Sequence, residues 1–177
     1  VYTKISQKEI NIINKKFNID KVISFKGIKQ GIENTNYLLK SKKKKYILTI
    51  FEKRVLQKEI PFFMKLMDKL NNSKINCPKP LKTRNNKYLI KLKNKTACIV
   101  SFLEGKDKKI LNINDCYAIG KTIARMHVVT NKMKLNRKNS MGIRNLKPLL
   151  NSIKFKSKKF SNLKIFLKNN LKDINKN

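Results

Sequence analysis

The spacing of apolar residues changes once along this chain, near residues 103–106. Before that point, short runs of β-branched and aromatic residues predict strands, and residues 46–51 form the clearest of these runs. After it, apolar residues recur at helical spacing. The change predicts an α+β fold, with a mostly antiparallel β lobe over residues 1–103 and a helical portion over residues 104–177.

Two helices are predicted within the β lobe. A capping box formed by Ser6 and Glu9 precedes apolar residues at helical spacing and predicts a helix over about 6–17. A second apolar stripe predicts a helix over about 57–71, with Pro61 near its start, where proline is tolerated. The other predicted elements are strands at 22–25, 37–39, 46–51, 88–90 and 96–103, and helices at 114–129, 145–155 and 160–173.

Basic residues are spread along the whole chain, since 44 Lys and Arg against 10 Asp and Glu give a net charge of +34. Only five of them are Arg, and this mixture suits neither bidentate phosphate binding nor the reading of bases. Lys, Asn and Ile share A/T-rich codons, so compositional drift explains their abundance, and a basic nucleic-acid-binding module remains the alternative. Weak, salt-sensitive attraction to polyanions is expected in both cases.

Several classes of protein do not fit the sequence. No apolar run reaches the roughly 20 residues of a membrane span, and three irregularly spaced cysteines suit neither a disulfide framework nor a zinc site. We therefore expect a cytoplasmic protein with reduced thiols, in which Cys77 and Cys98 are small core residues. The single histidine, His127, is expected to pack on an apolar face of the 114–129 helix, whose cap is predicted at Asn114 or Asp115.

A glycine-bearing ribbon lies between the first two predicted strands. Gly27 and Gly31 bracket a loop that continues through Asn34, although neither a Walker A motif nor a Gly-x-Gly-x-x-Gly motif is present. Glycine lets backbone N–H groups approach phosphates closely, so this loop is a candidate nucleotide lid. An ordinary hairpin would show the same pattern. In that case Asn34 and Asn36 would stabilise the loop through bonds from side chain to backbone.

The order of the elements narrows the fold further. A glycine-turn hairpin, an apolar strand, a helix, two strands, a polar joint and a helical portion follow one another in the N-lobe, hinge and early C-lobe of protein kinases. Several segments resemble the bacterial homoserine kinases of the aminoglycoside-phosphotransferase-like family: residues 22–39, 46–54, 61–67, 77–80 and 100–105, and the helix at 120–127.

This resemblance implies a protein-kinase-like fold that binds ATP with Mg²⁺ and phosphorylates L-homoserine in threonine biosynthesis. Phe102 and Leu103 would form the hinge that meets adenine, unless they are a simple linker between lobes. The position of the usual phosphate-binding lysine is occupied by Thr49. Lys53 or Arg54 would then supply that charge, the alternative being that both are solvated cations at a strand end.

The sequence also departs from the family pattern. It lacks the His-Gly/Ala-Asp catalytic loop and the later metal-binding aspartate, so we expect an N-terminal fragment with no catalytic or metal-binding residues before Asn177. Such a fragment should be inactive alone and prone to aggregation or partial unfolding. Another aminoglycoside- or choline-type small-molecule kinase remains open as the parent enzyme. No specific nucleic-acid partner and no membrane partner are expected.

Overall fold

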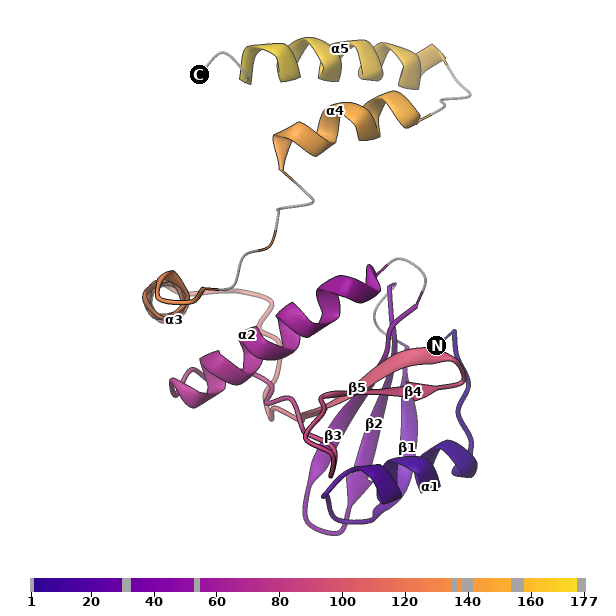
Figure 1. The fold of residues 1–177 in the computed structure, drawn as a ribbon. Helices are drawn as coiled ribbons and strands as arrows, with labels where there is room; N and C mark the ends of the chain where they lie inside the picture. The colour runs from indigo at the N-terminus through magenta and orange to yellow at the C-terminus, as the bar shows by residue number, and fades with distance from the viewer. Residues whose placement is uncertain are drawn as a thin grey trace. The chain divides into compact units, whose positions relative to one another are not determined.

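The computed structural model divides the chain into two compact units, Val1–Leu135 and Asn136–Asn177. The residues that it describes are 2–29, 33–52, 55–134, 137, 142–153 and 158–174. The first unit contains a five-stranded sheet with helices, and the second contains two helices (Figure 1). Within the described residues, none of the helices combines the length and the apolar character needed to cross a membrane.

The sheet of the first unit has the order β1-β2-β3-β5-β4, and each neighbouring pair is antiparallel. Its strands are β1 (Val22–Ile28), β2 (Thr35–Ser41), β3 (Lys45–Ile50), β4 (Leu89–Leu92) and β5 (Lys95–Ser101). The predicted antiparallel β lobe is therefore confirmed, including the hairpin whose turn carries the lysine cluster. The pairing of β3 with β5 brings together segments that the helix after β3 separates in the sequence.

Helices follow the predicted positions closely. The first unit contains α1 (Gln7–Lys16), the 3₁₀ turn η1 (Gln57–Glu59), α2 (Ile60–Asn72) and α3 (Ile113–Asn131). The second unit contains α4 (Ile143–Ser152) and α5 (Lys158–Ile174). The ammonium group of Lys164 on α5 donates to the carbonyl oxygens of Asn151 and Ile153 at 3.2 and 2.7 Å, which joins the two helices.

The face of the sheet toward α1 carries the larger core. Ile10 and Ile13 of α1 are fully buried against Leu39, Leu48 and Ile99 of the three central strands. Burial of five such side chains stabilises the fold by roughly 1.5–3 kcal/mol each. The space between α1 and the three central strands is therefore filled by side chains.

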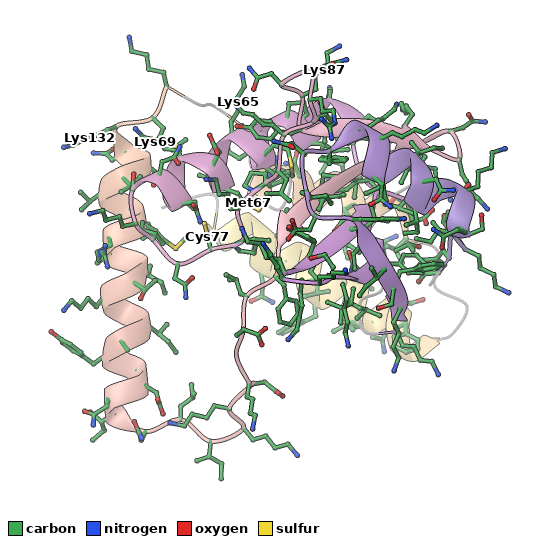
Figure 2. All side chains as sticks on the ribbon, turned by 90° about the horizontal axis from the view of Figure 1, so that it is seen from below. Lys65, Met67, Lys69, Cys77, Lys87 and Lys132 are labelled. Carbon is green, nitrogen blue, oxygen red and sulfur yellow. The ribbon has the colours of Figure 1, made fainter. Side chains whose placement is uncertain are left out.

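The opposite face carries a second core beneath α2. Ile60 and Met64 of α2 pack against Cys98 and Val100, which alternate with the residues of the first core along β5. Burial raises the pKa of the Cys98 thiol to about 12, so Cys98 is an unreactive core residue, as expected. Cys77 is half-buried, and its thiol donates to the carbonyl oxygen of Met67 at 3.5 Å (Figure 2).

Two expectations about α3 are wrong. Its cap is Asn112, whose side-chain oxygen accepts from the backbone N–H of Asp115 at 2.9 Å. In return, the Asp115 carboxylate accepts from the backbone N–H of Asn112 at 2.9 Å. Asp115 is thus the third helical residue of a capping box, and Asn114 lies inside the helix. His127 is exposed rather than packed, because none of the described residues of α3 is buried.

Candidate functional site

The α2 face of β2 and β3 presents a half-buried surface. Tyr37 and Leu39 belong to the core on the α1 side, so the alternation of a strand places Leu38 on the α2 face. Leu38 is paired with Ile47 of β3, and both are half-buried. We call these two side chains, with the polar pair formed by Asn36 and Thr49, the β2–β3 platform.

The polar end of the platform is held by side-chain hydrogen bonds. The hydroxyl of Thr49 donates to the side-chain oxygen of Asn36 at 2.8 Å, two register positions beyond Leu38–Ile47 and therefore on the same face. The side-chain oxygen of Asn34 accepts from the backbone N–H of Glu52 at 3.4 Å. Asn34 therefore links the start of β2 to the chain after β3.

One glycine of the predicted lid lies in a strand instead of a turn. Gly27 belongs to β1, opposite Tyr37 in the register, and β1 continues to Ile28. The prediction that Gly27 begins the loop is therefore wrong, because pairing with β2 extends β1 past it. Gly31, Lys53 and Arg54 lie outside the described residues, and their predicted contacts with phosphate remain predictions.

Lys45 holds the chain where it leaves β5. The backbone N–H of Phe102 donates to the carbonyl oxygen of Lys45 at 3.2 Å, and the Lys45 ammonium lies 5.2 Å from the centre of the Phe102 ring. The same ammonium is 2.7 Å from the Glu104 carboxylate. Leu103 between them is exposed, and its backbone makes no hydrogen bond with the described residues. The hinge predicted at Phe102 and Leu103 thus has backbone groups available at Leu103.

The two ends of the platform are separated along β3. Thr49 marks the polar end and Lys45 the hinge end, and four strand residues at about 3.3 Å each give roughly 13 Å. Leu38 and Ile47 lie between these ends. The platform thus carries an apolar strip near the hinge and hydroxyl and amide groups at its polar end.

A cluster around Glu52 lies at the polar end and was not predicted from the sequence. The hydroxyls of Thr3 and Thr35 donate to Glu52 at 2.6 and 2.8 Å, and the ammonium of Lys95 forms an ion pair with the same carboxylate. Burial acts to raise the pKa of Glu52, but the bonds from Lys95, Thr3 and Thr35 outweigh it and hold that pKa below its ordinary value. The cluster fixes the backbone directly before Lys53.

Possible metal ligands are scattered among the described residues. These residues contain no group of three or more His, Cys, Asp or Glu side chains that could hold a metal ion. Carboxylate oxygens are the protein ligands that Mg²⁺ prefers. The described part of the chain therefore does not by itself form a Mg²⁺ site.

The sequence is similar to a known protein family and to curated relatives. Residues 24–158 match the model of the phosphotransferase enzyme family. A homoserine kinase from Paramagnetospirillum magneticum is 39% identical over 154 residues, covering 87% of this chain and 47% of that protein. A homoserine kinase from Bradyrhizobium diazoefficiens is 35% identical over 152 residues, covering 86% and 46%. The chain thus spans about half the length of these curated relatives.

Solved structures resemble the fold at low sequence identity. A spectinomycin phosphotransferase in complex with ADP and spectinomycin superposes with a TM-score of 0.60 at 16% identity, covering 98% of this chain and 56% of that one. A microcompartment-associated aminopropanol kinase gives a TM-score of 0.59 at 13% identity, covering 81% and 48%. These likenesses confirm the predicted α+β, protein-kinase-like fold.

Proposed function

Because this chain belongs to the phosphotransferase enzyme family, we propose that it is the nucleotide-binding part of a homoserine kinase, which transfers the γ-phosphate of ATP to L-homoserine. The observation that carries the proposal is the 39% identity to a homoserine kinase over 87% of this chain. The products are O-phospho-L-homoserine and ADP, formed in threonine biosynthesis. We place the protein in the cytoplasm, where ATP and amino acids meet.

In this proposal the nucleotide would lie along the β2–β3 platform. Adenine would lie over Leu38 and Ile47 and bond to the backbone of Leu103, while the phosphates would lie toward Asn36 and Thr49. Lys53 and Arg54 follow the fixed Glu52 and would add positive charge there. Phosphoryl transfer depends on such positioning and on electrostatic stabilisation more than on covalent chemistry from the protein.

The remaining catalytic parts are not assigned to this chain. A carboxylate must orient the attacking hydroxyl of homoserine, and ATP is expected to arrive with Mg²⁺. The proposal places that carboxylate in the half of the curated relatives that this chain does not match. The boundary between a nucleotide-binding lobe over 1–103 and the C-lobe over 104–177 belongs to the same proposal.

The complete protein, with whatever its gene encodes beyond residue 177, provides the test. ATP-dependent release of ADP should require L-homoserine and be much slower with choline, aminopropanol or spectinomycin. The Lys53→Ala/Arg54→Ala variant should weaken ATP binding about tenfold or more, since two charged contacts to phosphate are lost. Lys42→Ala/Lys43→Ala removes the same charge at the hairpin turn and should change ATP affinity less than about twofold.

Two results would contradict the proposal. Homoserine-independent turnover, or a clear preference for one of the other acceptors, would assign the protein to another kinase of the family. Unchanged ATP affinity in the Lys53→Ala/Arg54→Ala variant would contradict the proposed contact of these two residues with phosphate.

A further inference from the structure

A concave site lies at the edge of the sheet formed by β4, which is the strand farthest from β1. The pocket has a volume of about 670 Å³, within the usual range for small-molecule sites. It is separate from the platform and shares no residue with it. Five cationic side chains line it, from the end of α1, the turn at 83–87 and β4: Lys15, Lys16, Arg84, Lys87 and Lys91.

Arg84 is fixed in place by the end of α1. Its backbone N–H donates to the carbonyl oxygen of Lys16 at 2.8 Å, and its Nε donates to that of Lys15 at 3.1 Å. These carbonyls are the negative end of the helix, and both are occupied by Arg84. The two terminal nitrogens of Arg84 make no hydrogen bond with the described residues. They are therefore available to a ligand, in the planar geometry that suits phosphate.

The floor of the pocket is equally ordered. The ammonium of Lys91 donates to the hydroxyl of Thr96 at 3.0 Å, and that hydroxyl donates to the side-chain oxygen of Gln57. Thr96 is buried. Because the side-chain oxygen of Gln57 is used in this way, its amide nitrogen remains as a further donor. Lys91 keeps two of its three N–H donors for a ligand.

The turn that carries Lys87 is also rigid. The backbone N–H of Thr83 donates to the carbonyl oxygen of Lys87 at 2.8 Å, and the N–H of Lys87 returns a bond to the Thr83 hydroxyl at 3.1 Å. A smaller cavity of about 280 Å³ on the other side of Lys87 is lined by Lys65 of α2, which Figure 2 shows near Lys87. Among the described residues, no carboxylate lines either cavity.

We propose that the β4-edge pocket binds a small polyanion, of the class of pyrophosphate and organic di- or triphosphates. A net charge of +34 makes exposed lysines common all over this chain. This pocket differs because its cations converge on one concavity and because Arg84 and Lys91 are held by named bonds. Preorganised donors of this kind lose little conformational entropy on binding.

Isothermal titration of the 177-residue chain with inorganic pyrophosphate tests the proposal. Physiological ionic strength should be used, where unlocalised charge attraction is screened beyond about 8 Å. The Arg84→Gln/Lys91→Gln variant should raise the dissociation constant about tenfold or more. The Lys42→Gln/Lys43→Gln variant removes the same charge at the hairpin turn and should raise it less than about twofold. Circular dichroism would confirm that each variant folds.

A second pair keeps the test informative if Arg84→Gln loosens the end of α1. Lys16→Gln/Lys87→Gln alters no side-chain hydrogen bond of the described residues and should still weaken pyrophosphate binding about fivefold. If the pocket variants and the hairpin variant lose pyrophosphate affinity equally, the binding depends only on net charge and the proposal is overturned. Unchanged affinity in both pocket variants would overturn it as well.

Two further experiments distinguish the pocket from the nucleotide site and pyrophosphate from a nucleic acid. If Lys53→Ala/Arg54→Ala abolishes pyrophosphate binding and the pocket variants do not, the anion occupies the nucleotide site and the pocket proposal is wrong. A short single-stranded RNA that displaces pyrophosphate and depends on the pocket pair would assign the pocket to a nucleic-acid backbone instead. Neither result depends on kinase activity, so the proposed function stands or falls separately.

Discussion

Glu52 receives hydrogen bonds from three side chains that are far apart in the sequence. Its carboxylate is only 12% exposed, and Thr3, Thr35 and Lys95 converge on it. The hydroxyl of Thr35 also accepts the backbone N–H groups of Tyr2 and Thr3, both at 3.0 Å. The ionised Glu52 carboxylate thus links the first residues of the chain to β2 and β5.

The ionisation of Glu52 predicts a loss of stability in acid. Its pKa in the folded chain lies below the unfolded value of about 4.5, so its stabilisation is complete above that value and is lost as pH falls through the folded pKa. Glu52→Gln should lower the free energy of unfolding at pH 7 by about 2 kcal/mol and flatten its decline in acid. Urea titrations from pH 7 to 3 would measure both effects.

A matched carboxylate provides the control for this prediction. Glu104 is also paired with a lysine, but its side chain is 75% exposed, so Glu104→Gln should cost less than about 0.5 kcal/mol. Glu9, whose pKa is lowered by its bonds with Ser6, leaves some acid dependence in both variants. Equal stability curves for Glu52→Gln and the wild-type chain would show that the cluster contributes nothing net.

At the level of single elements, α1 depends on its capping box. The Ser6 hydroxyl accepts from the backbone N–H of Lys8 at 3.3 Å, and the Glu9 carboxylate accepts from the N–H of Ser6 at 2.7 Å. Ser6→Ala should therefore lower the free energy of unfolding by about 1 kcal/mol in a urea titration. Ser24→Ala, at an exposed position of β1, should change it by less than about 0.5 kcal/mol. Similar values for both variants would contradict the role of the cap.

The local elements were predictable because each has a local cause. The capping box gave the start of α1, the apolar stripe gave α2, and β-branched runs gave β3 and β5. One error arose where tertiary pairing overrides local preference, since β2 extends β1 past Gly27. The other was a choice among neighbouring caps, since Asn112 caps α3 ahead of two equally suitable residues.

The candidate site was predictable only in part for the same reason. The hinge at Phe102 and the asparagines of the ribbon stand out in the sequence, but the bond from Asn34 reaches across to Glu52. No sequence pattern relates residues 3, 35, 52 and 95, because their meeting depends on the register of three strands. The β4-edge pocket depends in the same way on the contact of Arg84 with α1.

At the scale of the whole molecule, the first unit leaves one helix uncovered. On α3, Tyr117 is 70% exposed, Ile119 and Ile123 are each 47% exposed, and Val128 is 62% exposed. Ile119 and Ile123 share one side of the helix, and exposed apolar groups of this kind favour association.

The 177-residue chain should therefore self-associate as its concentration rises. Ile119→Gln/Ile123→Gln should shift sedimentation toward the monomer and reduce binding of a hydrophobic dye, because each change replaces an exposed apolar group on α3. Lys121→Gln on the same helix is the control and should leave both measurements near those of the wild-type chain. A monomer at all concentrations, without dye binding, would contradict the prediction.

The strand order has a consequence for synthesis on the ribosome. β3 ends at Ile50, and its partner β5 begins only at Lys95, after α2 and β4 have been made. At about 5–20 residues per second, those 44 residues take roughly 2–9 s, during which the nascent three-stranded meander has an open border along β3. The lysines at positions 42–45, beside that border, repel neighbouring nascent chains until β5 arrives.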